Sequence, residues 1–167
     1  VLALEDAGTL NKDLQDLAVV IASGYGAAST TFSFLDSILV EGDACASPTL
    51  FSNSLHNAAA AHISILLGAK GPSVTISQFE MSVLSALLTA CRWLEDGLVD
   101  AVLFGSVDEY CDVLGYCWLR FFGPGSAAGG MRPLELGVQS AVAGEGAAFF
   151  VLTRAGSGKA KYGCVSE

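Results

Sequence analysis

A change of pattern between residues 74 and 90 marks the stretch of this sequence best suited to chemistry. It opens as an alternating β-branched segment and closes as an apolar helix, VTISQFEMSVLSALLTA, so we expect a sharp bend between the two. Several enzyme folds hold a nucleophile at the tip of such a strand-to-helix bend. The residue expected at the tip here is Glu80, whose carboxylate is a poor nucleophile toward an acyl group.

Glu80 also fits a purely structural pattern together with Ser77. A serine followed three residues later by a glutamate, directly before an apolar helix, is typical of a capping box, in which each side chain bonds a backbone N–H near the other residue. Such a cap stabilises a helix by about 1 kcal/mol. We favour this capping role for Glu80, and a chemical or substrate-mimicking role is the alternative.

The composition is that of a domain with a large apolar core or interface. The chain has 167 residues, of which 52% are hydrophobic and 15% charged. Polar residues and glycines interrupt every apolar run before it reaches the ~20 residues needed to cross a bilayer, so we expect no membrane span. With no secretory signal visible, we expect a cytoplasmic protein, and the first residue resembles the middle of a longer polypeptide.

The net charge disfavours one class of partner, and the cysteine spacing indicates the state of the thiols. The net charge of -9 disfavours nucleic acid, because binding to it depends on neutralising phosphates. The five cysteines lack CxxC spacing, so we expect reduced, buried thiols. We expect no metal site and no cofactor.

Strands alternate with helices along the first two thirds of the chain, which is typical of an α/β fold with parallel strands. Strands are predicted at 18–24, at the start of the 74–90 stretch and at 101–107. Helices are predicted before Gly8, before Gly42, from about Ser54 to Leu67 with Gly68 as its cap, and at the end of the 74–90 stretch. The segment CDVLGYCWLRFFG is expected to be helical, GPGSAAGG to be a loop, and the strands around AGSGK to form an antiparallel hairpin. No linker divides the chain, so residues 1–167 are expected to form one incomplete domain.

Two further groups of side chains could bind ligands. Asp108 and Glu109 follow a predicted central strand, where open α/β sheets bind ligands. We nevertheless expect them to be solvated loop carboxylates. The aromatic residues Trp118, Phe121 and Phe122 are expected in a core or an interface rather than a ligand cage.

Three successive segments resemble the β-ketoacyl synthases, the thiolase-fold condensing enzymes of fatty acid and polyketide synthesis. They are SPTLFSNSLHNAAAAHISILLGAKGPSVTIS, VDAVLFGSVDEY and RPLELGVQSAVAGEGAAFFVLT. Their most specific parts are Asn53, Leu55, Asn57, Gly68, Gly71, Pro72, Arg132, Pro133 and the triplet Gly144, Glu145 and Gly146. The resemblance implies the N-terminal half of a thiolase-like layered α/β fold, a mixed sheet with helices on both faces.

The sequence departs from this family at the bend. Aligned on the family's Ser-Thr-Ala-Cys run, Ser77 takes the place of the serine and Glu80 that of the nucleophilic cysteine. A helix N-terminus favours the thiolate that carries an acyl group as a thioester, whereas a mixed anhydride on glutamate is too labile to serve as a carrier. The family's two catalytic histidines belong to the second half, and His56 and His62 do not match them, so we expect both to be structural.

The resemblance also gives the triplet Gly144, Glu145 and Gly146 a place near the floor of the active site. A backbone that needs glycine conformations, with Glu145 hydrogen-bonded to a neighbouring loop, explains this triplet without a catalytic role.

Two classes of function follow from the resemblance. The first is a catalytically degenerate subunit similar to a chain-length factor, which pairs with an active ketosynthase as a homo- or heterodimer through the strand SVTIS. The alternatives are a decarboxylase of malonyl thioesters and a fragment of an active 3-oxoacyl-[acyl-carrier-protein] synthase. An acyl carrier protein is a further expected partner, although the chain has only 8 Lys and Arg with which to bind that acidic protein.

Overall fold

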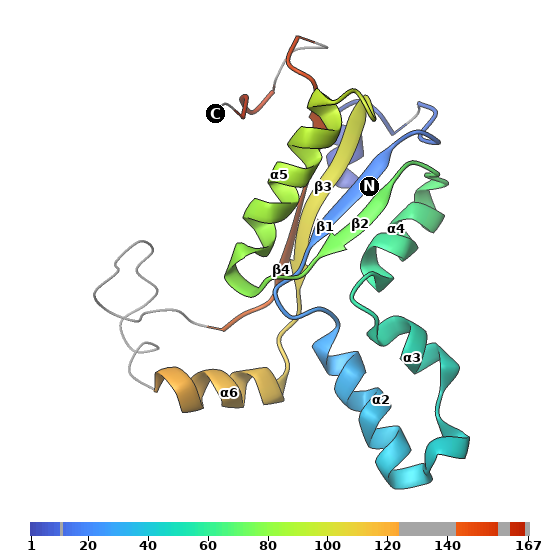
Figure 1. The fold of residues 1–167 in the computed structure, drawn as a ribbon, viewed down its shortest axis with the longest axis vertical. Helices are drawn as coiled ribbons and strands as arrows, with labels where there is room; N and C mark the ends of the chain where they lie inside the picture. Colours follow the sequence, from blue (N-terminus) through green and yellow to red (C-terminus); the bar gives the residue numbers. More distant parts are fainter. Residues whose placement is uncertain (11, 124–142, 157–160, 166–167) are drawn as a thin grey trace. The chain divides into compact units, whose positions relative to one another are not determined.

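The computed structural model describes residues 1–10, 12–123, 143–156 and 161–165, which form two compact units (Figure 1). The first unit comprises Val1–Tyr25, His56–Val107 and Ala147–Glu167. The second comprises Gly26–Leu55 and Asp108–Gly146. The segments of the two units alternate along the chain.

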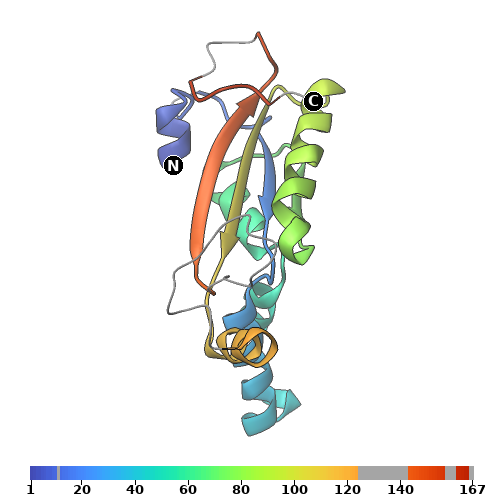
Figure 2. The same ribbon diagram turned by 90° about the vertical axis from the view of Figure 1, so that its left-hand side faces the viewer.

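A mixed sheet organises the first unit. In the described residues its strand order is β2-β1-β3-β4, with β1 at Ala18–Ala22, β2 at Ser73–Ile76, β3 at Ala101–Asp108 and β4 at Gly146–Thr153. Strand β1 is parallel to both neighbours, and Val20 lies opposite Val74 and Phe104. Figure 2 shows the arrow of β4 running opposite to that of β3, so the sheet is mixed.

Strand β1 is the centre of the core because both of its faces are covered by helices. Every residue of β1 is buried. On one face Val20 packs with Ala86 and Ala90 of helix α5, which spans Ser82–Glu95. On the other face Ile21 packs with Ala60 of helix α4, which spans Ala58–Leu67. The small alanine side chains allow both helices to approach the sheet closely.

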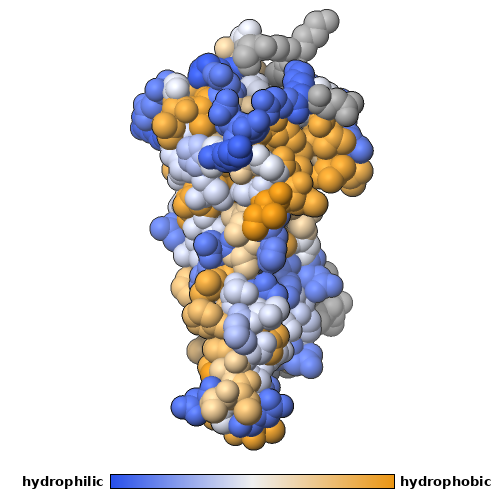
Figure 3. All heavy atoms as spheres, turned by 90° about the vertical axis from the view of Figure 1, so that its right-hand side faces the viewer, coloured by the Kyte–Doolittle hydropathy of each residue, from blue (hydrophilic) through white to orange (hydrophobic). Residues whose placement is uncertain are grey.

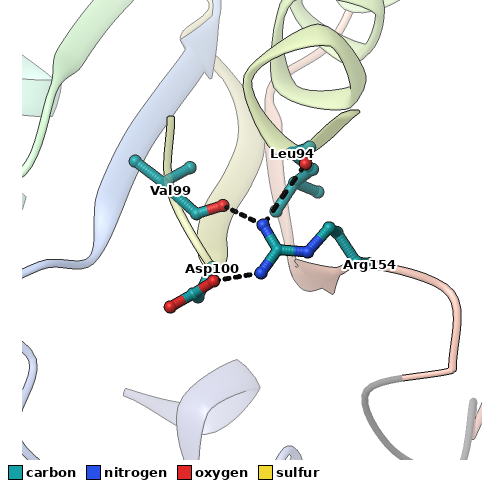
Figure 4. A network of polar contacts seen from close by, with 4 residues as sticks. All are labelled: Leu94, Val99, Asp100 and Arg154. Carbon is teal, nitrogen blue, oxygen red and sulfur yellow. Dashed lines mark hydrogen bonds and ion pairs between the residues drawn. The ribbon is translucent and has the colours of Figure 1, made fainter. Parts of the chain in front are cut away.

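Strand β4 packs against the rest of the first unit at Gly105 and is linked to it by the side chain of Arg154. A side chain at Gly105 of β3 would lie 2.2 Å from the ring of Phe149, so only glycine lets that ring cover β3. Just after β4, the guanidinium of Arg154 donates to the carbonyls of Leu94 and Val99, at 3.4 and 3.2 Å, and pairs with Asp100 (Figure 4). Arg154 therefore ties β4 to the end of α5 and the start of β3.

A short helix and the end of the chain also meet in the first unit. Helix α1 spans Leu2–Asp6, and Leu4 packs with Leu17 and Leu103. The Asp6 carboxylate accepts a hydrogen bond from Tyr162 at 2.7 Å and pairs with Lys161. These contacts hold residues 161 and 162 against α1.

The second unit contains helices with few buried side chains. They are α2 at Ala28–Glu41, α3 at Pro48–Ser54, α6 at Asp112–Phe122 and a 3-10 turn at Asp43–Cys45. The Ser47 side chain caps α3 by accepting from the N–H of Leu50 at 3.3 Å, and the rings of Phe34 and Phe51 lie 5.5 Å apart between α2 and α3. Within these helices only Ala28 and Gly115 are buried, so most of their apolar side chains are partly or largely exposed.

The elements agree with most of the predictions. The strands at β1 and β3, the ends of α2 at Gly42 and of α4 at Gly68, and the helix α6 are confirmed. The prediction of one helix from Ser54 to Leu67 was wrong, because α3 ends at Ser54 and α4 begins only at Ala58.

Three expectations about the rest of the chain have mixed outcomes. No strand follows β4 among described residues 154–156 and 161–165, so a hairpin around AGSGK is not seen there, and β4 pairs with β3 instead. The GPGSAAGG segment after Gly123 lies outside the described residues. The expectation of buried thiols was wrong, since all five cysteines are free but Cys45 and Cys164 are exposed and the others half-buried.

None of the described helices has the length and apolar character that a membrane span requires.

Candidate active-site bend

The bend between β2 and α5 has a strained backbone. Strand β2 ends at Ile76, a 3-10 turn occupies Phe79–Met81, and α5 begins at Ser82. Phe79 has a φ of 49°, and it is the one non-glycine residue with positive φ in the described part of the chain. Such a conformation costs a bulky L residue about 1–3 kcal/mol, so the surrounding contacts must hold it.

Ser82 supplies those contacts from the first position of α5. Its side chain is 2% exposed, and its Oγ accepts from the N–H of Gln78 at 2.8 Å. The same Oγ lies 2.7 Å from the carbonyl oxygen of Phe79 and 3.0 Å from that of Ser23, and it can donate to one of them at a time. Ser82 thus joins both sides of the bend to the segment after β1.

Two flanking side chains complete the bend. Ser77 Oγ donates to the carbonyl of Gly24 at 3.3 Å, and Ser85 Oγ donates to Oε1 of Gln78 at 2.6 Å. The ring of Phe79 meets the ring of Tyr25 edge-on, with centroids 5.8 Å apart. All of these contacts lie within the first unit, so the bend is a feature of that unit alone.

The predicted capping box of Ser77 and Glu80 is wrong. Helix α5 starts five residues after Ser77, and the intervening 3-10 turn takes Glu80 out of the third helical position that a capping box requires. Neither the turn nor α5 has a side-chain N-cap hydrogen bond. Glu80 is exposed and has no hydrogen bond or ion pair with the residues that the structure describes.

Two of the predicted carboxylates hold backbone in the second unit. Glu109 accepts from the N–H of Ser29 at 2.7 Å, in the first turn of α2, where Ala27 cannot cap the helix. Glu109 is a half-exposed carboxylate of the loop after β3, as expected, and in addition it bonds the first turn of α2. The Glu145 carboxylate accepts from the N–H of Tyr110 at 3.4 Å, which is a contact to a neighbouring loop of the kind expected.

The other residues predicted near a site are two glycines, two histidines and the aromatic residues of α6. Gly144 and Gly146 do not have positive φ, and an added side chain would meet nothing within 4 Å, so the expected need for glycine conformations is absent. Both histidines are exposed, His56 in the turn before α4 and His62 on α4. In α6 the rings of Trp118 and Phe122 lie 4.6 Å apart.

Sequence reasoning missed the residues that shape the bend. The positive φ of Phe79 had no signal, because glycine and asparagine are the usual markers of that conformation. The role of Ser82 had a weak signal in the serines at positions 77, 82 and 85, which surround the start of an apolar helix. No group of three His, Cys, Asp or Glu that could hold a metal is present in the described segments.

A comparison with models of protein families identifies the family of this chain. The family model described as "Beta-ketoacyl synthase, N-terminal domain" matches residues 1–157. The chain belongs to the β-ketoacyl synthase family. The sequence had predicted this family and the N-terminal half of its fold, and both predictions are confirmed.

Curated relatives of this ketosynthase-like chain agree. It is 26% identical to 3-oxoacyl-[acyl-carrier-protein] synthase 2 of Vibrio cholerae over 169 residues, which cover 95% of this chain and 40% of the relative. It is 30% identical over 121 residues to a mycocerosic acid synthase-like polyketide synthase of Mycobacterium tuberculosis, covering 71% of this chain and 6% of that protein. The ketosynthase-like chain thus spans less than half the length of these relatives.

Solved structures confirm the thiolase-like α/β fold. A β-ketoacyl synthase from Burkholderia phymatum superposes with a TM-score of 0.78 at 21% identity, over 91% of this chain and 39% of that one. The ishigamide ketosynthase/chain length factor superposes with a TM-score of 0.69 at 21% identity, over 89% of this chain and 38% of that one. The chain is a ketosynthase-like domain of the kind found in proteins of fatty acid and polyketide synthesis.

Proposed function

We propose that this chain is the first half of a catalytically inactive ketosynthase-like subunit, which works beside an active ketosynthase as a chain-length factor does. The observation that carries the proposal is the identity of Glu80. It stands at the bend where the family resemblance puts the nucleophilic cysteine, and its carboxylate is exposed. A glutamate there cannot hold an acyl chain as a thioester, so an acyl-transfer role needs a thiol from another subunit.

The free edge of the sheet supports pairing with such a subunit. Among the strands that the structure describes, β2 has a neighbour on one side only, β1, and an unpaired strand edge favours association with another strand. Next to β2, helix α4 exposes Ile65 and Leu66. Figure 3 looks onto the side of the molecule where α4 and β2 lie in Figure 1, and it shows hydrophobic residues gathered there.

Charge supports a division of labour between the two subunits. Acyl carrier proteins are acidic and bind to basic surfaces, whereas this chain has 17 Asp and Glu against 8 Lys and Arg. The partner subunit would therefore supply the carrier-protein surface. One solved structure with this fold, at 18% identity, is described as an acyl-carrier protein in complex with its ketosynthase.

Co-expression of the full-length protein with a cysteine-bearing ketosynthase tests the proposal. We expect the two to co-purify as a heterodimer, and we expect condensation of octanoyl and malonyl carrier proteins by the pair but not by the full-length protein alone. Condensation by the full-length protein alone would overturn the proposal. Decarboxylation of malonyl carrier protein without condensation would favour the decarboxylase instead.

A further inference from the structure

One side of helix α2 carries a row of exposed apolar side chains. Phe32, Leu35 and Leu39, which we call the α2 stripe, follow one another at three- and four-residue spacing, so they are neighbours along the helix. All three are exposed, and Leu39 and the adjoining Val40 reach 82% and 83%. A single exposed leucine needs no explanation, but contiguous apolar side chains of this kind mark an interaction surface.

The packing of α2 in the second unit uses other residues of the helix. The ring of Phe34 lies 5.5 Å from that of Phe51 on α3, and Thr31 Oγ lies 3.4 Å from the carbonyl oxygen of Ser54. Because the residues that make these contacts lie between the positions of the stripe, the stripe takes no part in them. Packing within the described residues of the second unit therefore gives no reason for the α2 stripe to be apolar.

The charges around the α2 stripe are all negative. Asp36 lies beside the stripe, one helical turn after Phe32, and Glu41 and Asp43 follow at the end of the helix. Residues 13–69 contain no Lys or Arg, and none of these three carboxylates has an ion pair with the residues that the structure describes. A helix C-terminus favours cations, so Glu41 is unfavourably placed in the chain alone. A cationic partner would relieve this repulsion.

We propose that the α2 stripe docks a cationic amphipathic helix of a partner protein. Apolar side chains of that helix would pack on the stripe, and its lysines or arginines would lie against Asp36 and Glu41. The stripe covers two helical turns, about 10 Å, which matches the apolar anchors that such helices present at three- and four-residue spacing. The same carboxylates disfavour an acidic partner or an anionic lipid surface. This interaction does not involve the bend, so it goes beyond the proposed function and does not depend on it.

Binding of a model peptide to the full-length protein tests this surface. The probe is a fluorescein-labelled peptide of leucine and lysine, about 14 residues long, with the leucines at helical spacing. A control peptide has glutamate in place of every lysine. We expect fluorescence anisotropy to show binding of the lysine peptide and none of the glutamate peptide. Asp36→Lys should weaken binding of the lysine peptide about tenfold through charge repulsion, and Leu39→Ser about fivefold through loss of apolar contact.

Two matched controls separate this surface from the general negative charge of the chain. Asp16 is an exposed carboxylate of the first unit, and Leu2 on α1 is 81% exposed, so Asp16→Lys and Leu2→Ser make the same chemical changes elsewhere. Both should leave the affinity for the lysine peptide nearly unchanged.

Three results of the binding experiment would each overturn the inference. They are no binding of the lysine peptide, equal binding of the glutamate peptide, and equal losses in Asp36→Lys and Asp16→Lys. Sedimentation of the full-length protein adds a fourth, because a homodimer that is lost in Leu39→Ser would assign the α2 stripe to a second copy of the chain instead.

Discussion

The two ends of helix α5 differ in how well their residues suit their positions. At the C-terminal end Leu94 is buried in the core, and Arg154 donates to the carbonyl of Leu94 and to that of Val99, which follows the helix. At the N-terminal end the backbone is strained at Phe79, no side chain caps the helix, and Glu80 is exposed. The comparison teaches that the C-terminal end of α5 is closed by stabilising contacts, whereas the N-terminal end carries backbone strain and no helix cap.

Truncation of Leu94 should produce the largest effect on stability. Its side chain is 6% exposed, so Leu94→Ala should lower the free energy of unfolding by about 2–5 kcal/mol through a cavity in the core. Leu88→Ala, on the exposed side of the same helix, is the control and should change it by less than about 0.5 kcal/mol. Denaturation in urea measures both. Equal losses would mean that the exposed side of α5 is packed against something.

Removal of the Ser82 hydroxyl should have the next largest effect. Ser82→Ala leaves the N–H of Gln78 without its partner near a buried position, which costs about 1–3 kcal/mol. Ser77→Ala should cost less, because its bond to Gly24 is 3.3 Å long and half-buried. If Ser77→Ala proved the more damaging change, the bend would be held from the strand side and not from the helix side.

Two substitutions at Phe79 measure the strain at the N-terminal end directly. Both Phe79→Gly and Phe79→Ala remove the ring, but only glycine adopts positive φ without a steric penalty. The free energy of unfolding should therefore be about 1 kcal/mol higher in Phe79→Gly than in Phe79→Ala. Identical stabilities would show that the backbone at this position relaxes when the ring is removed.

The contact between Asp6 and Lys161 should give the smallest effect, and one that depends on pH. Hydrogen bonds from Lys161 and Tyr162 lower the pKa of Asp6, and the bond to Asp6 raises the pKa of Lys161. The Asp6 contribution is therefore present above its unfolded pKa of about 4 and is lost as the pH falls through the lowered value. The protection of the amides at residues 161–165, which is the exchange rate corrected for its intrinsic pH dependence, should fall in acid, and Asp6→Asn should show the low protection at neutral pH. Unchanged protection in Asp6→Asn would contradict this contact.

The core and the order of elements could be predicted because they depend on local patterns. Strand β1 is an uninterrupted apolar run, and Gly42 and Gly68 stand directly after the helices that they end. The contacts of Glu109 could not be predicted, because Ser29 lies 80 residues away in the sequence. Only the folded chain brings such residues together.

The position of the bend was predicted, but its 3-10 turn and the first residue of α5 were not. The switch from alternating to helical periodicity located it, but a short 3-10 turn has no distinct period, so the start of α5 was placed too early. That shift turned Ser77 and Glu80 into an apparent capping box and concealed Ser82 as the residue that holds the bend. The strain at Phe79 comes from tertiary contacts, and its residue type gives no sign of it.

The most direct test of the proposed function is the location of the acyl group. Octanoyl carrier protein is incubated with the heterodimer of the full-length protein and a cysteine-bearing ketosynthase, and digested peptides are analysed by mass spectrometry. The account predicts an octanoyl thioester on the cysteine of the partner subunit and no acyl group on the peptide that contains Glu80. A stable octanoyl group on that peptide would contradict it.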